Sequence, residues 1–251
     1  MQSTRLADKM ILDIHGIPLI IRTVRQALQS DAKDVFVATD DHKIERICND
    51  YGAKVIMTKR EHETGTDRLA EAVAILNLND DEIIINVQGD EPLINPALIN
   101  NLAQFIMNRG TEVATIAHKI HTDNEIFNAS IVKVVLDAQG NAMYFSRAPI
   151  PYYRDGFVEK LNFNLPQGIH FLRHIGMYAY SVKFLKNYNN MPDSPIEHVE
   201  KLEQLRILYH GHKLSVLISD IVPEGGVDTL EDLERVRQLF YNMEISGKGG
   251  Y

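Results

Sequence analysis

Two carboxylates, Asp90 and Glu91, stand directly after an apolar, β-branched run at residues 83–87 and a glycine, Gly89. Such a run predicts a buried strand. Ligands of open α/β sheets bind outside the carboxyl ends of the strands, so we expect the Asp90 carboxylate to project into a ligand site. Because Gly89 has no Cβ, it should let a ligand approach the backbone closely. A carboxylate at this place suits a hard cation such as Mg²⁺, which takes oxygen ligands and carries substrate phosphates. A capped strand end with a solvated aspartate is an equally good interpretation.

A second junction of glycine and aspartate, Gly226-Val227-Asp228, precedes a helical pattern that begins near residue 230. The simpler interpretation is a helix start, with Thr229 as the N-cap and Asp232 three residues further on. The alternative is that Asp228 and Asp90 hold one metal ion. Both aspartates lie at the ends of predicted elements, so their separation in the sequence does not argue against a shared site.

Several cationic side chains stand where strands end or helices start, and phosphates and carboxylates are bound at such places. They are Arg5 and Lys9 in a polar N-terminal loop, Arg68 at a helix start, Arg147 after a strand, and Arg173 with His174 before a strand. Taken singly, each is more simply a solvated surface cation. A helix predicted over residues 197–209 places Glu200 and Gln204 one turn apart on one face, where exposed polar residues are common.

Composition and absent motifs exclude several classes of function. The 251 residues include 26 Lys and Arg against 34 Asp and Glu, a formal net charge of −8, which argues against a nucleic-acid-binding surface and leaves an anionic small substrate open. No apolar run approaches the ~20 residues of a membrane span, and the polar start predicts no signal peptide.

The sequence lacks GxGxxG, GxxxxGK[ST], HExxH and CxxC, and His118 with His121 is a poor zinc pair. The single Cys48 excludes an intrachain disulfide, fits the cytosol and is best explained by packing.

Hydrophobic periodicity predicts an α/β protein. In the first half, helices are expected at 17–28, 42–50, 66–76 and 96–107, and strands at 35–39, 55–57 and 83–87. This alternation predicts a parallel sheet with helices on both faces. Further on, strands are expected at 112–119, 131–136, 142–145, 175–180 and 214–218, a hairpin turn at 137–141, a surface loop at 152–170, and helices at 197–209 and 230–243.

Taken in order, these segments resemble the 3-deoxy-manno-octulosonate cytidylyltransferases, and the match runs nearly the whole length. The motifs that carry it are Ser3-Thr4-Arg5-Leu6 with Lys9, Val37-Ala38-Thr39-Asp40-Asp41, Gly65-Thr66-Asp67-Arg68, Asn86-Val87-Gln88-Gly89-Asp90-Glu91-Pro92, Ser130-Ile131-Val132-Lys133-Val134-Val135, Tyr144-Phe145-Ser146-Arg147, Arg173-His174-Ile175-Gly176-Met177-Tyr178-Ala179-Tyr180, Leu202-Glu203-Gln204-Leu205-Arg206 and Gly226-Val227-Asp228-Thr229. Each is weak alone, but together in this order they are highly specific. The resemblance implies a mostly parallel, Rossmann-like nucleotidyltransferase sheet with helices on both faces and a smaller mixed β insertion. It also implies one domain over residues 1–245 with a disordered tail at 246–251.

The resemblance implies an activity: transfer of CMP from CTP to the anomeric hydroxyl of 3-deoxy-D-manno-octulosonate (KDO), with release of pyrophosphate, for lipopolysaccharide assembly. Mg²⁺ would be held by Asp90 and Asp228, and these two residues and Lys9 would be catalytic. The nucleotide would be bound by Arg5, Lys9, Thr66, Arg68 and Gln88, and the sugar by Arg147, His174, Tyr178, Glu200 and Gln204. The family suggests a cytoplasmic homodimer, with neither nucleic acid nor membrane as a partner.

The sequence departs from the family pattern in three places. Leu6-Ala7-Asp8-Lys9 stands where the family has Leu-Pro-Gly-Lys, and Glu63-Thr64 where it has Pro-Ser. The chain also starts at Met1-Gln2-Ser3, so we expect the family's first apolar strand, which ends in Pro-Ala-Arg, to be missing. A catalytically impaired nucleotide- or sugar-binding form is therefore the alternative to the enzyme, and an analogue such as 8-amino-KDO is the alternative substrate.

Overall fold

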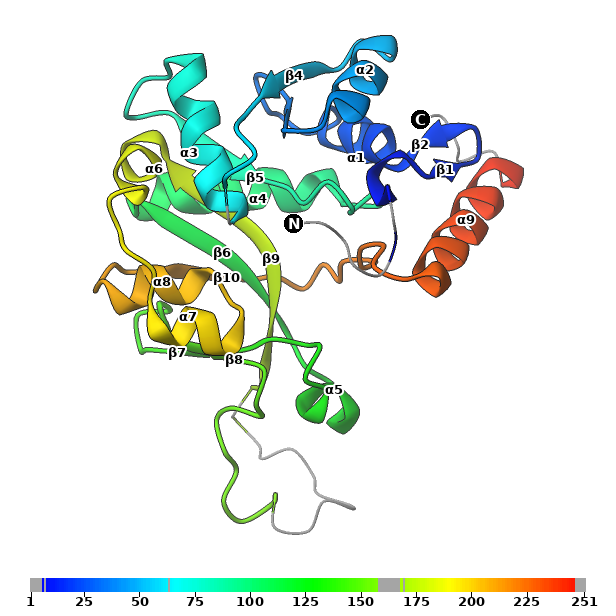
Figure 1. Cartoon of the computed structure of the whole chain (residues 1–251). Helices are drawn as coiled ribbons and strands as arrows, with labels where there is room; N and C mark the ends of the chain where they lie inside the picture. Colours follow the sequence, from blue (N-terminus) through cyan, green and yellow to red (C-terminus); the bar gives the residue numbers. More distant parts are fainter. Residues whose placement is uncertain (1–5, 7, 63, 158–167, 169, 247–251) are drawn as a thin grey trace. The chain divides into compact units, whose positions relative to one another are not determined.

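The computed structural model describes residues 6, 8–62, 64–157, 168 and 170–246 (Figure 1). The chain divides into two compact units. Unit 1 comprises residues 1–80, 86–101 and 223–251, and unit 2 comprises residues 81–85 and 102–222. The predicted single domain over 1–245 stays a prediction, because two compact parts of one chain do not show whether they fold separately. The chain start, for which a missing strand is expected, and most of the predicted tail lie outside the described residues.

Unit 1 is built around one central helix, α1 (Leu19–Ala27). One face of α1 packs with Leu19 against α9 (Leu230–Ile245), and the other packs with Ile20, Ile21 and Val24 against Val37 and Cys48. Cys48 is fully buried in this cluster, which confirms the packing role predicted for it. The other elements are the 3₁₀ turn η1 (Lys9–Ile11), the hairpin β1 (Asp13–Ile14) and β2 (Ile17–Pro18), β3 (Phe36–Thr39), α2 (His42–Asp50), β4 (Lys54–Met57) and α3 (Gly65–Leu76).

The strands β3 and β4 pair in parallel, with α2 as the crossover between them. The order strand, helix, strand predicted from the periodicity is confirmed here, because parallel neighbours need a crossover connection of this kind. α4 (Pro96–Arg109) begins in unit 1 and ends in unit 2.

Unit 2 holds a six-stranded mixed sheet (Figure 1). The strand order is β10-β6-β9-β7-β8, and β5 also pairs with β9. These strands are β5 (Ile83–Asn86), β6 (Val113–Lys119), β7 (Lys133–Leu136), β8 (Ala142–Ser146), β9 (Leu172–Ser181) and β10 (Ser215–Ile218). The helices are α5 (Asp123–Phe127), α6 (Val182–Tyr188), α7 (Pro195–Glu200) and α8 (Gln204–Tyr209).

The prediction of a mostly parallel sheet is wrong for this unit. β10 and β6 are parallel, but β9 runs antiparallel to both β6 and β7, and β7 is antiparallel to β8. The turn at 137–141 joins β7 and β8 as a hairpin, as predicted. Between β6 and β9 the chain forms α5, β7 and β8, and within the described residues α5 is the one helix there. A helix this short is no long crossover that would return a strand in the same direction.

The helix predicted over 197–209 is two helices. α7 ends at Glu200, the following residue Lys201 adopts the left-handed conformation with φ 55°, and α8 starts at Gln204. The break has a physical cause, because the Arg206 guanidinium makes two 2.8 Å hydrogen bonds to the buried Glu197 carboxylate. In a continuous helix residues nine apart would be separated by about 13 Å along the axis. The buried ion pair therefore requires the chain to turn back, and Glu200 and Gln204 do not share a helix face.

None of the helices in the described ranges combines the length and apolar character that a bilayer crossing requires.

Candidate functional site

Unit 1 brings Lys9, Asp90 and Asp228 together. Lys9 Nζ donates to Asp90 Oδ2 at 2.6 Å and to Asp228 Oδ1 at 3.0 Å. Lys9 is 8% exposed, whereas the Asp90 and Asp228 side chains are 22% and 70% exposed, so the cluster opens to solvent on the Asp228 side. The structure thus brings Asp90 and Asp228 to one site, where both carboxylates contact Lys9, while their sharing of a metal ion stays a prediction. Burial opposes the charge on Lys9, but its hydrogen bonds and ion pairs with both aspartates outweigh burial and raise its pKa.

Backbone contacts hold the two aspartates in place. Val227 N–H donates to the carbonyl oxygen of Asp90 at 2.9 Å. This bond ties the turn that carries Asp90 to the loop that carries Asp228. A Cβ on Gly226 would lie only 3.1 Å from that same oxygen, which explains a glycine at this position. Thr23 in α1 donates to the Gly89 carbonyl at 2.9 Å and fixes the turn after β5.

The role predicted for Gly89 is different from the one observed. A Cβ there would meet Ile20 Cδ1 at 3.0 Å and Met10 Sδ at 3.3 Å. The missing side chain therefore makes room for packed apolar side chains of the protein itself. Other atoms do approach the Gly89 backbone closely, as predicted, but they belong to the side chains of Ile20 and Met10.

The capping prediction at Thr229 is confirmed. Thr229 Oγ1 accepts from Asp232 N–H, and the Asp232 carboxylate accepts from Thr229 N–H, which forms a capping box at the start of α9. Because Asp232 caps the helix, the Asp228 side chain is left to reach Lys9. The two interpretations of this junction are compatible.

The residues predicted to bind the nucleotide fall into three situations. Arg5 lies outside the described residues. Thr66, in the first turn of α3, is 1% exposed, while Gln88 is exposed in the turn after β5. Arg68 forms an ion pair with Asp40 at 3.0 Å and donates to Thr58 Oγ1. The sequence assigned no ion-pair partner to Arg68, although Asp40 directly follows β3, where ligand sites are expected.

In unit 2, Glu200 and Arg147 meet at the ends of α7 and β8. The Glu200 carboxylate accepts from Ser146 Oγ at 2.5 Å and from Arg147 N–H at 3.0 Å, and Arg147 Nε donates to the Glu200 carbonyl at 2.9 Å. Behind them, the fully buried Lys133 donates to the carbonyls of Arg147, Asn128 and Ile131 at 2.5–2.9 Å. Desolvation lowers the pKa of Lys133. Ser146 and Lys133 position Arg147 and Glu200, and no local spacing in the sequence reveals this.

His174 and Tyr178 lie together on β9, with ring centroids 5.4 Å apart. Thr115 Oγ1 donates to the Met177 carbonyl at 2.7 Å, so it accepts the 2.9 Å hydrogen bond from His174 Nε2. Part of His174 still reaches solvent, but its ring packs edge-on against Phe145, and desolvation lowers its pKa to about 3. Burial likewise raises the pKa of Tyr178. Both side chains are therefore neutral near pH 7.

Gln204, at the start of α8, is 3% exposed, and its Nε2 atom is buried with no hydrogen-bond partner among the described residues. Buried amide groups without a partner are costly, and each one calls for an explanation such as a missing ligand or water. Gln204 is one of the residues predicted to bind the sugar, and its amide is available for such a bond.

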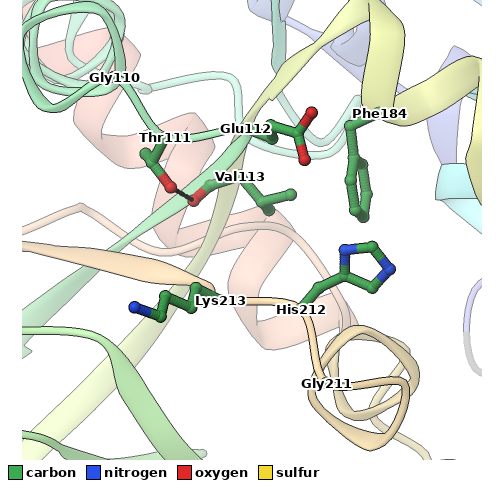
Figure 2. A pocket seen from close by; sticks show the side chains of 8 residues that line it. All are labelled: Gly110, Thr111, Glu112, Val113, Phe184, Gly211, His212 and Lys213. Carbon is green, nitrogen blue, oxygen red and sulfur yellow. Dashed lines mark hydrogen bonds between the residues drawn. The ribbon is translucent and has the colours of Figure 1, made fainter.

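A cavity of about 310 Å³ in unit 2 holds none of the predicted residues (Figure 2). Its lining is Gly110, Thr111, Glu112, Val113, Phe184, Gly211, His212 and Lys213. Two of the lining side chains, Phe184 and His212, contact each other edge to face, with ring centroids 5.4 Å apart (Figure 2). The cavity lies at the amino ends of the parallel strands β6 and β10, opposite to the ends where α/β sheets bind ligands. The Lys9–Asp90–Asp228 cluster and the predicted residues of unit 2 are therefore better candidates for the substrate site than this cavity.

Comparison with known proteins agrees with this picture. The fold is that of an α/β nucleotidyltransferase: a solved structure of CMP:2-keto-3-deoxy-manno-octonic acid synthetase complexed with CTP matches with a TM-score of 0.85 at 39% identity, over 96% of this chain and 94% of that chain. A cytidylyltransferase from Leptospira borgpetersenii shares the fold alone, with a TM-score of 0.59 at 15% identity over 96% of this chain and 83% of that chain.

The sequence comparisons are more specific. The family described as cytidylyltransferase matches residues 1–215. The 3-deoxy-manno-octulosonate cytidylyltransferase of Neisseria gonorrhoeae (strain NCCP11945) is 48% identical over 240 residues, 96% of this chain and 94% of the relative. That of Herminiimonas arsenicoxydans is 49% identical over 238 residues, 95% and 94% of the two chains. The chain belongs to the 3-deoxy-manno-octulosonate cytidylyltransferase family.

Proposed function

We propose that this chain transfers CMP from CTP to the anomeric hydroxyl of KDO, giving CMP-KDO and pyrophosphate, and so activates the sugar for lipopolysaccharide assembly. The observation that carries the proposal is the Lys9–Asp90–Asp228 cluster, in a chain that matches relatives of this named activity over 96% of its length. Family membership gives the reaction, and the cluster supplies charged groups suited to it.

The donor set of the cluster fits Mg²⁺. Two carboxylates converge on one cationic group, Lys9 Nζ, and Mg²⁺ is usually bound through one or two carboxylates together with substrate phosphates and waters. Asp90 and Asp228 would hold the ion. When bound, it would neutralise phosphate charge and make the attacking hydroxyl more acidic. Lys9 would contribute a further positive charge to the triphosphate.

The remaining predicted residues are assigned as follows. Thr66, Arg68 and Gln88, together with Arg5, would bind the nucleotide. In unit 2, the unpartnered amide of Gln204 would donate to a sugar oxygen, and Arg147, held by Glu200, would face the acid sugar as a cation. His174 and Tyr178 would shape the pocket as neutral groups. A homodimer in the cytoplasm belongs to the same proposal.

A panel of substrates tests the proposal. Pyrophosphate release would be measured with CTP, ATP or GTP, each with and without KDO, 8-amino-KDO or sialic acid. We expect release that requires both CTP and an acidic eight-carbon sugar, since a site built to hydrogen-bond one base rejects others. A faster reaction with 8-amino-KDO would reassign the substrate. Binding of CTP without turnover of any sugar would favour an impaired binding form.

A further inference from the structure

We propose that Lys9 acts as an internal counter-cation that occupies the place of the metal, so that a divalent ion binds well only after Lys9 has left the two aspartates. Because the metal role of Asp90 and Asp228 belongs to the proposed function, this inference deepens that function. It adds a coupling between the metal and the nucleotide.

The geometry makes the two cations mutually exclusive. Lys9 Nζ lies 2.6 Å from an Asp90 oxygen and 3.0 Å from an Asp228 oxygen, so the ammonium fills the space between them. A Mg²⁺ ion shared by the same oxygens would sit about 2.1 Å from each. It would then compete with the ammonium for the same lone pairs, at a distance where two positive charges repel strongly.

The surroundings of Lys9 make it a stable occupant. It is 8% exposed, and the two carboxylates are its hydrogen-bond partners within the described residues. Without the ammonium, two carboxylates tied together through the Val227–Asp90 backbone bond would face each other uncompensated. Lys9 thus stabilises the cluster when no other cation is present.

Triphosphate offers Lys9 a replacement partner. The lysine side chain has a flexible four-carbon stem, so the ammonium can move to a nearby anion without any change in backbone. Its departure frees both carboxylates for a metal ion. Since coupling between two ligands is reciprocal, nucleotide should strengthen metal binding and metal should strengthen nucleotide binding.

The first test measures Mn²⁺ binding by electron paramagnetic resonance, without nucleotide, to the full chain and to Lys9→Met. We expect Lys9→Met to bind Mn²⁺ at least about tenfold more tightly, as the removal of two competing ion pairs implies. Lys54→Met, which removes an exposed lysine that pairs with Asp34 instead, should bind as the unaltered chain does. Adding Asp228→Asn to Lys9→Met should abolish the gain. Equal affinity in Lys9→Met and the unaltered chain would overturn the inference.

A second test needs no variant. The rate of reductive methylation of Lys9 is measured by mass spectrometry with increasing Mg²⁺ and no nucleotide. We expect the rate to rise as Mg²⁺ displaces the ammonium, while methylation of Lys54 stays constant. An unchanged rate at saturating Mg²⁺ would contradict the displacement. Neither test measures turnover, so a failure of CMP transfer would overturn the proposed function and leave this inference standing, and the reverse also holds.

Discussion

The backbone N–H of Val227 donates a 2.9 Å hydrogen bond to the carbonyl oxygen of Asp90, although the two residues lie 137 positions apart in the sequence. This bond places the loop before α9 against the turn after β5, and it sets the distance between the two carboxylates that meet Lys9. The neighbouring Gly226 allows the approach, because a Cβ there would lie 3.1 Å from the same oxygen and 3.8 Å from Asp90 Cγ.

Gly226→Ala should therefore push the two aspartates apart. We expect turnover to fall about tenfold or more, because shifting catalytic groups by even a fraction of an ångström up to about 1 Å is that costly. The fold should be retained, as checked by circular dichroism, because the clash needs only a few tenths of an ångström of movement. Full activity in a folded Gly226→Ala variant would mean that the Asp90–Asp228 distance is not critical.

Glu200 should matter for the sugar more than for the nucleotide. Glu200→Ala removes the acceptor for Ser146 and for the Arg147 N–H. We expect the KM for the acid sugar to rise about tenfold with little change in the KM for CTP, and the free energy of unfolding to fall by about 1–3 kcal/mol. Glu200→Gln keeps one acceptor oxygen, so its KM for the acid sugar should lie between those of the unaltered chain and Glu200→Ala. Steady-state kinetics with each substrate varied in turn measures the split, and equal changes in both KM values would argue against the assignment.

His174 predicts a pH dependence of stability. Its pKa is lowered to about 3 by desolvation, against about 6.5 in the unfolded chain. Below pH 6.5 the unfolded state therefore takes up a proton that the folded state does not. The free energy of unfolding is thus highest above pH 6.5, as far as His174 is concerned, and it falls as the pH drops from 6.5 towards 3. The loss is about 1.4 kcal/mol per pH unit, or about 2 kcal/mol between pH 6.5 and 5.

Denaturant unfolding at several pH values checks this dependence. His174→Gln should lack that part of the decline, whereas His42→Gln, which alters a side chain 76% exposed, should keep it. Parallel curves for the unaltered chain and His174→Gln would show that His174 is solvated enough to titrate normally.

Local patterns were enough to predict much of unit 1. The helical stripes, the capping box at Thr229 and Asp232, and the placement of Asp90 after a strand all depend on residues a few positions apart. The sequence could also place Asp228 at an element end. It could not show that Asp228 meets Lys9, because that contact spans 219 residues.

The errors share one physical cause, which is non-local contact. The break at Lys201 depends on the buried Glu197–Arg206 ion pair, and the antiparallel direction of β9 depends on its pairing with β6 and β7. Gly89 looked like a ligand contact because the sequence does not reveal that Ile20 and Met10 pack against it. The ion pair between Arg68 and Asp40 is also non-local, and the nucleotide-binding role of Arg68 stays a prediction.

The proposed function depends most on Asp90 and Asp228, and the rate of CMP-KDO formation as a function of Mg²⁺ concentration tests their role most directly. Asp90→Asn and Asp228→Asn should each lower kcat by about 10²-fold or more at saturating Mg²⁺, as is typical when one electrostatic contributor to the transition state is lost. The melting temperature should stay close to that of the unaltered chain, and Asp34→Asn, a change at an exposed ion pair with Lys54, should keep normal turnover. A near-normal kcat in either Asp90→Asn or Asp228→Asn at saturating Mg²⁺ would contradict the assignment of this cluster as the metal site.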